Sequence, residues 1–369
     1  MLADQIAGTD AMRARCPVAH SEYLQWSLFR HRDVERVLGD PAVFSNAVSS
    51  HLSVPNGFDP PEHTAYRRLI DPYFSSERMA EFEPACRGVA VELISGLRRA
   101  CEVEFTSEFA DLFAIRAQCA FLDWPSRLHG PLLEWTRKNH AAVLSGDRDA
   151  QAAVAVEFDG TIRGLINERS GQDRATQEDA VARLLQERID GRPLREEEIV
   201  SILRNWTVGE LSTISACVGI LAHFLAARPE VQLQLRAEPA LLPAAIEEIL
   251  RIHGPLITSR RITTQETEVA GLRLSPGARV TLMWASANRD EREFGDPDEF
   301  RLDRDPAKNL LYGAGIHACP GAPLARLELR VILEELLKRT RSIALASGKE
   351  PVRAVYPAGG FTALPLLFE

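Results

Sequence analysis

The sequence lacks the features that would place the protein outside the cell or on nucleic acid. Its six cysteines stand at positions 16, 86, 101, 119, 217 and 319, without paired spacing and without a CxxC motif. This pattern favours a reducing cytoplasm over a disulfide framework. The formal net charge of -9 offers no support for nucleic-acid binding, which requires a basic face.

The sequence also has no segment that predicts export or membrane insertion. The first ten residues contain neither a basic region nor an apolar core, so they do not form a signal peptide. The longest apolar stretch, Cys217 to Ala227, includes His223 and is too short to cross a bilayer. A length of 369 residues with 45% hydrophobic and 26% charged residues predicts a soluble globular protein with a sizeable core.

The most informative stretch is a loop of turn-forming residues around Cys319. Gly313, Gly315 and Gly321 surround this cysteine, and apolar residues at helical spacing begin at Leu324. Cys319 therefore lies at a helix N-terminus, where unpaired N–H groups favour a thiolate that can act as a nucleophile or a metal ligand. The glycines leave room for a large, flat group to approach the backbone.

The run Tyr312-Gly-x-Gly-x-His-x-Cys319-x-Gly321, continued by Leu324-Ala-Arg326, resembles the heme-ligand loop of the cytochrome P450 family. In that family the cysteine thiolate is the axial ligand of the heme iron. The resemblance implies that Cys319 binds the iron of heme b. The residues expected to contact this cofactor within the loop are Tyr312 (where the family usually has Phe), Gly313, His317, Cys319 and Gly321. Taken alone, Cys319 could equally be a buried structural cysteine beside a helix cap.

The resemblance also implies the fold. It covers roughly residues 24–80 and 195–369. It predicts one mainly helical domain over 1–369, with small β-sheets, a long central helix over the heme and a proximal helix after the cysteine loop. The lead-in before residue 24 is shorter than is usual in the family. Helical patterns are expected at 79–99, 109–121, 128–144, 156–168, 177–189 and 195–227, and a terminal hairpin within 359–367.

His63 and Arg67 are predicted to share one face of a helix that starts at Pro60 and Pro61. Two cationic donors on one face suit an anion, although a solvated charged face is the simpler explanation of His63 alone. The resemblance assigns both residues to a heme propionate, and it adds Arg261 by alignment.

Glu248 and Arg251 form an E-x-x-R pair, whose spacing places both charges side by side on a helix. The motif alone is weak, but the resemblance makes the pair a structural lock. A third, basic member usually comes from the segment before the cysteine loop. Here Glu299 stands at its place, so Arg301 or Arg304 is expected to replace it.

Counting back from Pro229 places Thr213 at the position of the family's oxygen-activating threonine, whose hydroxyl steers protons. The usual preceding acid is replaced by Ser212, and the usual glycine by Glu210. Because a helix turns 100° per residue, Glu210 points nearly opposite to Ser212. Three accounts remain open: Ser212 with a water conveys protons, Glu210 faces the pocket and binds substrate or supplies protons, or oxygen activation differs.

The resemblance implies a heme-thiolate monooxygenase of bacterial type that inserts an oxygen atom from O2 into a small, mainly apolar molecule. No flavin or iron–sulfur motif is present, so electrons are expected from a ferredoxin with its reductase, or a flavodoxin. Lys308, Arg326 and Arg330 could meet an acidic donor, or they could be ordinary helix surface. The expected substrate-binding residues are Val208, Leu211, Leu256, Ile257, Thr258 and Phe361.

Two alternatives to this function remain open at the level of sequence. Ser212 and Glu210 are compatible with a peroxide-driven or non-oxygenating heme-thiolate enzyme. A non-catalytic heme-binding sensor would keep the cysteine loop without turnover, and Thr213 argues mildly against it.

Overall fold

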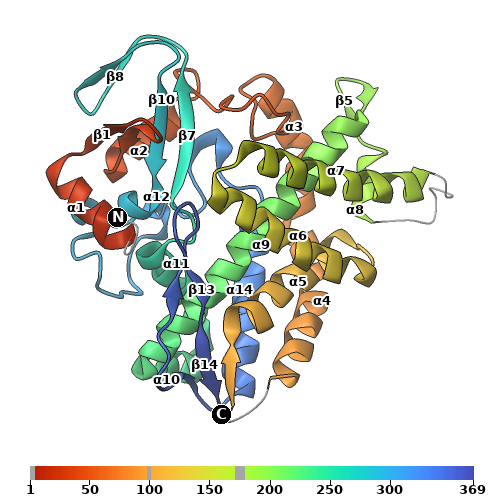
Figure 1. Ribbon diagram of the computed structural model, residues 1–369, viewed down its shortest axis with the longest axis vertical. Helices are drawn as coiled ribbons and strands as arrows, with labels where there is room; N and C mark the ends of the chain where they lie inside the picture. The colour runs from red at the N-terminus through yellow and green to blue at the C-terminus, as the bar shows by residue number, and fades with distance from the viewer. Residues whose placement is uncertain (1–4, 98–100, 171–178) are drawn as a thin grey trace.

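A computed structural model describes residues 5–97, 101–170 and 179–369 (Figure 1). It is mainly helical, with 58% of residues in helices and the remainder in small sheets and loops. The predicted fold class is therefore confirmed. The N-terminal strands and helices α1 and α2 lie on one side of the long helix α9, and helices α4 to α8 lie on the other (Figure 1).

Helix α9 (Glu196–Ala227) runs through the middle of the molecule, close to the predicted range (Figure 1). At 32 residues it is about 48 Å long. Among the described residues it is the one helix long and apolar enough to cross a membrane, but 67% of its apolar window is buried inside the protein. It packs against α5, α7, α11 and α14, so its apolar faces form the core of the fold.

The other helices surround α9, and short 3₁₀ turns join several of them. Their bounds are α1 (Gln5–Arg15), α2 (His31–Gly39), α3 (Glu62–Ile70), α4 (Ser76–Ser95), α5 (Asp111–Leu122), α6 (His129–Ser145), α7 (Arg148–Ser170), α8 (Ala180–Leu184), α10 (Pro229–Ala237), α11 (Leu242–His253), α12 (Trp284–Ala287), α13 (Glu291–Phe294) and α14 (Ala322–Arg339).

The strands form one five-stranded sheet, one three-stranded sheet and three two-stranded ladders. The first sheet has the order β1 (Val18–Ser21), β2 (Gln25–Leu28), β10 (Arg279–Met283), β7 (Thr258–Thr263), β3 (Phe44–Ser45), in which only β2 and β10 are parallel. The second has the order β11 (Ile343–Leu345), β14 (Pro365–Phe368), β4 (Glu102–Glu104). The ladders pair β12 (Val352–Arg353) with β13 (Phe361–Ala363), β5 (Arg188–Ile189) with β6 (Arg192–Pro193), and β8 (Thr267–Val269) with β9 (Leu272–Leu274).

Two local predictions were wrong. The helix expected over 177–189 is limited to α8, because a hairpin with positive φ at Asp190 and Gly191 follows it; residues 177 and 178 lie outside the described residues. The terminal hairpin does not form, because β13 and β14 belong to different sheets. Between them the buried Leu364 donates its N–H to Glu104 and accepts a hydrogen bond from the N–H of Phe105.

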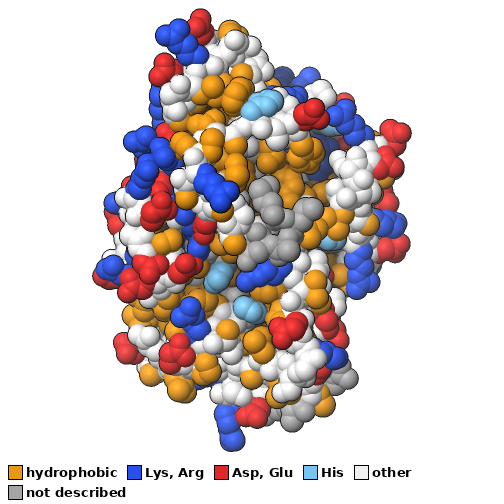
Figure 2. Space-filling model, turned by 60° about the vertical axis from the view of Figure 1, so that its left-hand side comes forward, with side chains coloured by type: hydrophobic (Ala, Val, Ile, Leu, Met, Phe, Trp, Pro, Cys, Tyr) orange, Lys and Arg blue, Asp and Glu red, His pale blue; other side chains and the backbone are white. Residues whose placement is uncertain are grey.

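Side chains of both charge signs are interspersed with hydrophobic ones on the face drawn in Figure 2.

The predicted lock between Glu248 and Arg251 is present and buried. Arg251 donates from Nε to Oε2 of Glu248 (2.7 Å) and from Nη2 to Oε1 (2.9 Å). Of the two candidates for the third member, Arg304 is the one that joins, with its Nε 2.8 Å from Oε1. Arg301 gives only its backbone N–H (3.2 Å), because its side chain pairs with Asp303. Multiple hydrogen bonds to each charge offset the cost of burying it.

The lock fixes the segment that leads into the cysteine loop. Arg251 donates from Nη1 to the carbonyl oxygen of Asn288 (2.7 Å), and the side-chain oxygen of Asn288 accepts the N–H of Leu310 (2.8 Å). Asn309 donates to the carbonyl oxygen of Glu247 on α11 (3.1 Å). The start of the loop is therefore tied to α11 by hydrogen bonds on both sides.

Replacing the third member of the lock tests its contribution. Arg304→Gln removes the ion pair with Glu248 and should cost about 2 kcal/mol or more of unfolding free energy, since hydrogen bonds to charged groups are the strong ones. Arg301→Gln is the matched control and should cost far less. Urea unfolding of both variants measures the difference, and equal midpoints would contradict this role of Arg304.

Candidate functional site: the cavity between Cys319 and the central helix

A cavity of about 430 Å³ lies between α9 and the loop around Cys319. Its walls come from segments far apart in the sequence. Helix α9 contributes Asn205, Trp206, Gly209, Glu210, Thr213, Ile214 and Cys217, and the loop contributes Leu311, Tyr312, Gly313, His317, Cys319, Pro320 and Gly321.

The residues of α9 that line the cavity form two stripes, each with residues spaced four apart, because four residues bring a helix almost back to the same face. The first stripe is Asn205, Gly209, Thr213 and Cys217, and the second is Trp206, Glu210 and Ile214. Thr213 therefore faces the cavity that Cys319 lines from the other side. Ser212 lies one position off this stripe, is exposed, and does not line the cavity.

Val208 and Leu211 are not brought to the cavity wall. Both residues lie off the two stripes. Leu211 is buried in the hydrophobic core, and Val208 is partly buried and packs against this core. Placing them in the pocket would need a different rotation of α9 about its axis. The structure gives their expected substrate-binding role no support.

Of the three substrate-binding residues expected after α11, alternate side chains point to opposite sides of the extended backbone. Leu256 and Thr258 line the cavity, whereas Ile257 points the other way and packs with Phe29 and Met283. Phe361 also lies outside the cavity wall, since its ring packs on His223 at 4.5 Å between centroids.

Cys319 is an exposed residue and lines the cavity. Its backbone N–H donates to the carbonyl oxygen of Tyr312 (2.8 Å), which closes the loop. Burial among protein atoms raises the pKa of the Cys319 thiol, while N–H groups of Gly321 and Ala322 donate to the sulfur and oppose the rise. The predicted N–H groups of the helix start are thus in place, and a bound metal ion would remove the thiol proton outright.

The loop is held from two sides. Gly315 adopts φ +67°, and a Cβ at this position would overlap the carbonyl oxygen of Leu38 at the end of α2. Arg67 donates to the carbonyl oxygens of Ile316 (3.2 Å) and Ala318 (2.8 Å). Arg67 therefore positions the loop in this structure, besides the anion-binding role expected from the sequence.

His317 lines the cavity, and the buried ring of His63 packs behind it in a tilted arrangement, with ring centroids 4.2 Å apart. Neither nitrogen of the buried His63 has a hydrogen-bond partner among the described residues, and neither has Nε2 of His317. Burial lowers the pKa of both rings, that of His317 to about 4 with His63 and Arg261 adding to the effect. Since a neutral imidazole has one N–H donor and one acceptor nitrogen, each ring has one N–H to offer to an acceptor.

Arg261 lines the cavity beside these rings and is 4% exposed. Its Nη1 donates to Ser259 and to its own strand's backbone, and burial lowers its pKa to about 10, opposed by Asp59. Among the described residues Arg261 has no ion pair within contact distance, and only the charge of Asp59 acts on it, so its buried guanidinium favours a negatively charged ligand. The positive charge of Arg261 and the unpartnered nitrogens of His63 and His317 fit the carboxylate of a heme propionate.

Tyr312, at the position expected for Phe, directs its ring under the guanidinium of Arg326, 4.4 Å from the ring centroid. Its hydroxyl is buried without a partner among the described residues, and burial raises its pKa. The tyrosine thus provides the flat, apolar contact of a phenylalanine and adds one unpaired hydroxyl to the cavity side of the loop.

Glu210 lines the cavity, and its carboxyl group interacts electrostatically with that of Glu328 on α14. Among the described residues, neither oxygen of Glu328 and not Oε1 of Glu210 has a hydrogen-bond partner. Both carboxyl groups are buried, Glu328 with 0% exposure and Glu210 with 8%. Burial raises the pKa of each, and their proximity keeps the pKa of Glu328 well above its ordinary value. Glu210 therefore points toward α14, on the side of α9 away from the exposed Ser212, as helical geometry predicted.

Sequence reasoning missed several polar and aromatic residues of the site. The i,i+4 spacing back from Thr213 could have found Asn205, whereas no local signal marks the others, because distant segments bring them to the cavity or its edge. They are Asn46, Phe74, Gln118, Asn205, Trp206, Trp284 and Glu328.

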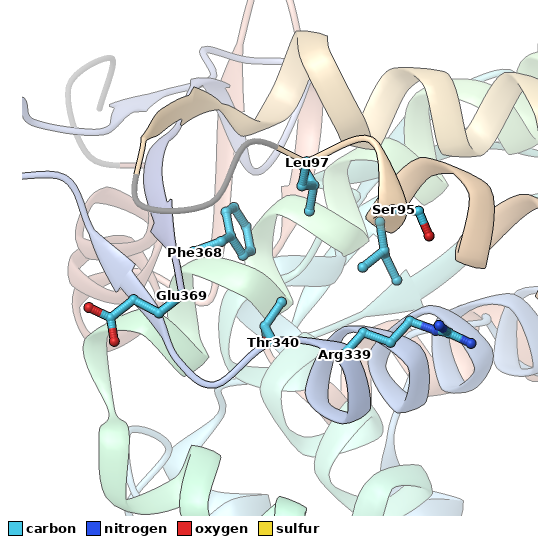
Figure 3. A pocket seen from close by; sticks show the side chains of 7 residues that line it. Ser95, Leu97, Arg339, Thr340, Phe368 and Glu369 are labelled. Carbon is cyan, nitrogen blue, oxygen red and sulfur yellow. The ribbon is translucent and has the colours of Figure 1, made fainter.

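A smaller pocket lies elsewhere, between the C-terminal ends of α4, α14 and β14 (Figure 3). Its volume is about 270 Å³, and the side chains drawn there include Arg339, Thr340, Phe368 and Glu369. Residues from the cysteine loop or from the α9 stripes are absent from its described lining, so the larger cavity is the candidate site.

Comparison with known proteins gives one consistent result. A family model described as Cytochrome P450 matches residues 128–353. The chain is 31% identical to cyclomarin C epoxidase CymV of Salinispora arenicola over 89% of this chain and 87% of that protein. It is 30% identical to erythromycin C-12 hydroxylase of Saccharopolyspora erythraea over 95% and 92%, respectively. A solved mutant of P450 EryK in complex with erythromycin B has a TM-score of 0.89 at 28% identity, covering 98% of this chain and 95% of that one.

The close approach of the loop to α2 can be tested with two glycines that both have positive φ. Gly315→Ala should destabilise the protein by about 1–3 kcal/mol more than Gly348→Ala, because only the first Cβ meets backbone atoms. Gly348 has φ +77° and nothing within 4 Å of its added Cβ, so it reports the cost of φ alone. Unfolding midpoints measure both effects, and equal losses would contradict the packing described.

Proposed function

Since this chain belongs to the cytochrome P450 family and is a heme-thiolate monooxygenase that uses heme b, we propose that it oxidises a small, mainly apolar organic molecule with electrons delivered by a separate protein. The observation that supports this proposal most directly is the arrangement of the cavity. The sulfur of Cys319 faces it from one side, Thr213 faces it from the other, and unpaired donors lie at its rim.

The cofactor is held by residues that the cavity brings together. We propose that Cys319 binds the iron and that His63, Arg261 and His317 donate to a propionate. Arg67 keeps the loop in place through its carbonyl oxygens. Gly321 leaves space beside the sulfur, and Gly313 leaves space beside Trp284. When bound, the heme supplies the oxidising chemistry, in which O2 takes up two electrons and two protons while one oxygen atom enters the substrate.

Thr213 is proposed as the hydroxyl that passes protons within the cavity. It lies on the α9 stripe that faces Cys319, and a hydroxyl both donates and accepts hydrogen bonds. Ser212 was expected to share this work with a water molecule, but its exposed position off the cavity wall gives that idea no support.

Electrons are proposed to come from a ferredoxin with its reductase, or from a flavodoxin. The three basic residues considered for docking are each in an ion pair, Lys308 with Glu293 (2.6 Å), Arg326 with Glu247 (2.7 Å) and Arg330 with Glu83 (2.6 Å). An acidic donor would compete with these carboxylates, which favours the alternative that the three residues mainly stabilise the helix surface.

The substrate is proposed to contact the wall formed by Leu256, Thr258 and Asn205, where apolar and polar groups alternate. The loop that contains Leu52 and Val54 is tied to α9. Asn205 donates to the carbonyl oxygen of Val54 (2.9 Å), and Arg204 donates to that of Leu52 (2.7 Å). The relatives act as a cyclomarin C epoxidase and an erythromycin C-12 hydroxylase, which supports a product of secondary metabolism as the substrate class.

We also propose that residues 1–369 act as one domain in a bacterial cytoplasm. The similarity to bacterial relatives extends over 89–95% of the chain, and α9 is the buried centre of the fold.

The cofactor assignment is tested by the spectrum of the reduced protein with carbon monoxide. The wild-type protein should give the band typical of thiolate-bound heme, and Cys319→Ala should abolish it because the iron loses its sulfur ligand. Cys217→Ala is the matched control, since Cys217 lines the same cavity from α9. A thiolate band that survives in Cys319→Ala would refute the proposed ligand.

The role of Thr213 is tested by product yield per O2 consumed, with ferredoxin, reductase and NAD(P)H. Thr213→Ala should lower this yield about tenfold or more, because the loss of a general acid–base group commonly has an effect at least this large. Ser212→Ala should change it little. Equal yields for wild type and Thr213→Ala would contradict the proton role, and turnover by peroxide alone would favour the peroxide-driven alternative.

A further inference from the structure

Asn46 lies beside the ring of His317, and no sequence motif assigns it a role. It lines the cavity together with Arg261 and His317, and its amide nitrogen Nδ2 lies 3.4 Å from Nδ1 of His317. Asn46 directly follows strand β3, whose Ser45 pairs with Ile262, the neighbour of Arg261 on β7. Asn46 is therefore placed among the residues that fit a heme propionate.

The orientation of the Asn46 side chain is set by a second contact. Its Nδ2 also donates to the backbone carbonyl oxygen of Asn56, which can only accept a hydrogen bond. If the amide oxygen stood in this place, it would face that carbonyl oxygen and be repelled by it. The group that faces Nδ1 of His317 is therefore the NH2 donor of the amide and not its oxygen.

The backbone of Asn46 is held as well. Its N–H donates to Oδ1 of Asp59 (3.0 Å), and Oδ2 of Asp59 accepts the hydroxyl of Ser45 (2.5 Å). Both oxygens of this carboxylate are thus engaged within the loop. The carbonyl oxygen of Asp59 accepts the N–H of His63 (3.0 Å) at the start of α3. The residue that holds Asn46 therefore also holds the helix that brings His63 to His317.

A donor that faces Nδ1 decides which nitrogen of His317 has the proton. A cationic ring has an N–H at both nitrogens, and a neutral ring protonated at Nδ1 would place its N–H against the NH2 of Asn46. Only the neutral ring with its proton on Nε2 accepts the hydrogen bond from Asn46. This Nε2 is buried and has no partner among the described residues, so its N–H is available to a ligand in the cavity.

We propose that Asn46 holds His317 in the tautomer whose Nε2–H donates to a heme propionate, which makes Asn46 a positioning residue of the cofactor site. The proposal rests on the heme binding of the proposed function and adds the residue that makes His317 a donor. A histidine that binds through one ring nitrogen is commonly oriented by a hydrogen bond at the other. The ring keeps the same proton throughout, so no proton or electron is transferred.

The position of the proton can be measured in the wild-type protein by nitrogen nuclear magnetic resonance of isotope-labelled histidine rings. The heme-loaded ferrous protein with carbon monoxide is the sample, and the signals of His317 are those missing from His317→Leu. Nε2 should be protonated and Nδ1 unprotonated at neutral pH. A proton on Nδ1 would overturn the proposal, and this result needs no variant of Asn46 to fold.

Transfer of heme to an excess of apomyoglobin measures what Asn46 contributes to cofactor binding. Asn46→Leu should release heme about three- to tenfold faster than the wild-type protein, because one hydrogen bond commonly contributes a factor of this size. Asn56→Leu is the matched control. Asn56 also lines the cavity, but it contacts Asn46 through its backbone carbonyl, which the substitution retains. Its release rate should stay close to that of the wild-type protein.

A double-mutant cycle tests whether Asn46 acts through His317. In the His317→Leu background, Asn46→Leu should change the release rate little, because the ring that it positions is absent. If Asn46→Leu accelerates release equally in both backgrounds, or no more than Asn56→Leu does, Asn46 only fills space and the proposal is wrong. Absence of the thiolate-type carbon monoxide band in the wild-type protein would instead refute the proposed function.

Discussion

The position of the cysteine loop depends on the buried ion pairs of Glu248 with Arg251 and Arg304. These three side chains join α11 to the irregular segment that precedes the loop, and each charge has several hydrogen bonds that offset its desolvation. From this point Asn288 and Asn309 extend the connection to the start of the loop. A loop rich in glycine has little rigidity of its own, so it must be held by its neighbours.

The cavity is electrostatically divided. One part of it is formed by Arg261 and His317, with His63 packed behind them, and burial lowers the pKa of all three while Asp59 opposes the effect. Its inner wall leads to Glu210 and Glu328, acids whose pKa values burial raises. The part around Arg261 is therefore suited to a ligand with carboxylates, whereas the buried acids on the inner side disfavour negative charge. The sulfur of Cys319 and the hydroxyl of Thr213 lie on facing walls of this divided space.

Much of the site was predictable because its signals are local. The loop around Cys319, the helical spacing of His63 and Arg67, and the pair Glu248 and Arg251 each lie within a few residues, and the structure places them as local geometry requires. Predictions that depended on the rotation of a helix or strand about its axis were less successful. Leu211 and Ile257 are apolar residues of the right segments, but each points into the core.

The sequence by itself determined the turn-rich cysteine loop at a helix start and the long apolar helix, since these follow from turn formers and apolar periodicity. The resemblance that the loop motif carries implied the fold class and the role of Cys319 as a heme ligand. Only the tertiary structure decided that Arg304 rather than Arg301 completes the lock, that Ser212 is exposed, and that Glu210 interacts electrostatically with Glu328. The physical reason is that each of these outcomes depends on how two distant segments pack. A contact across about 120 residues of chain, such as that between α9 and α14, leaves no local periodicity from which it could be read.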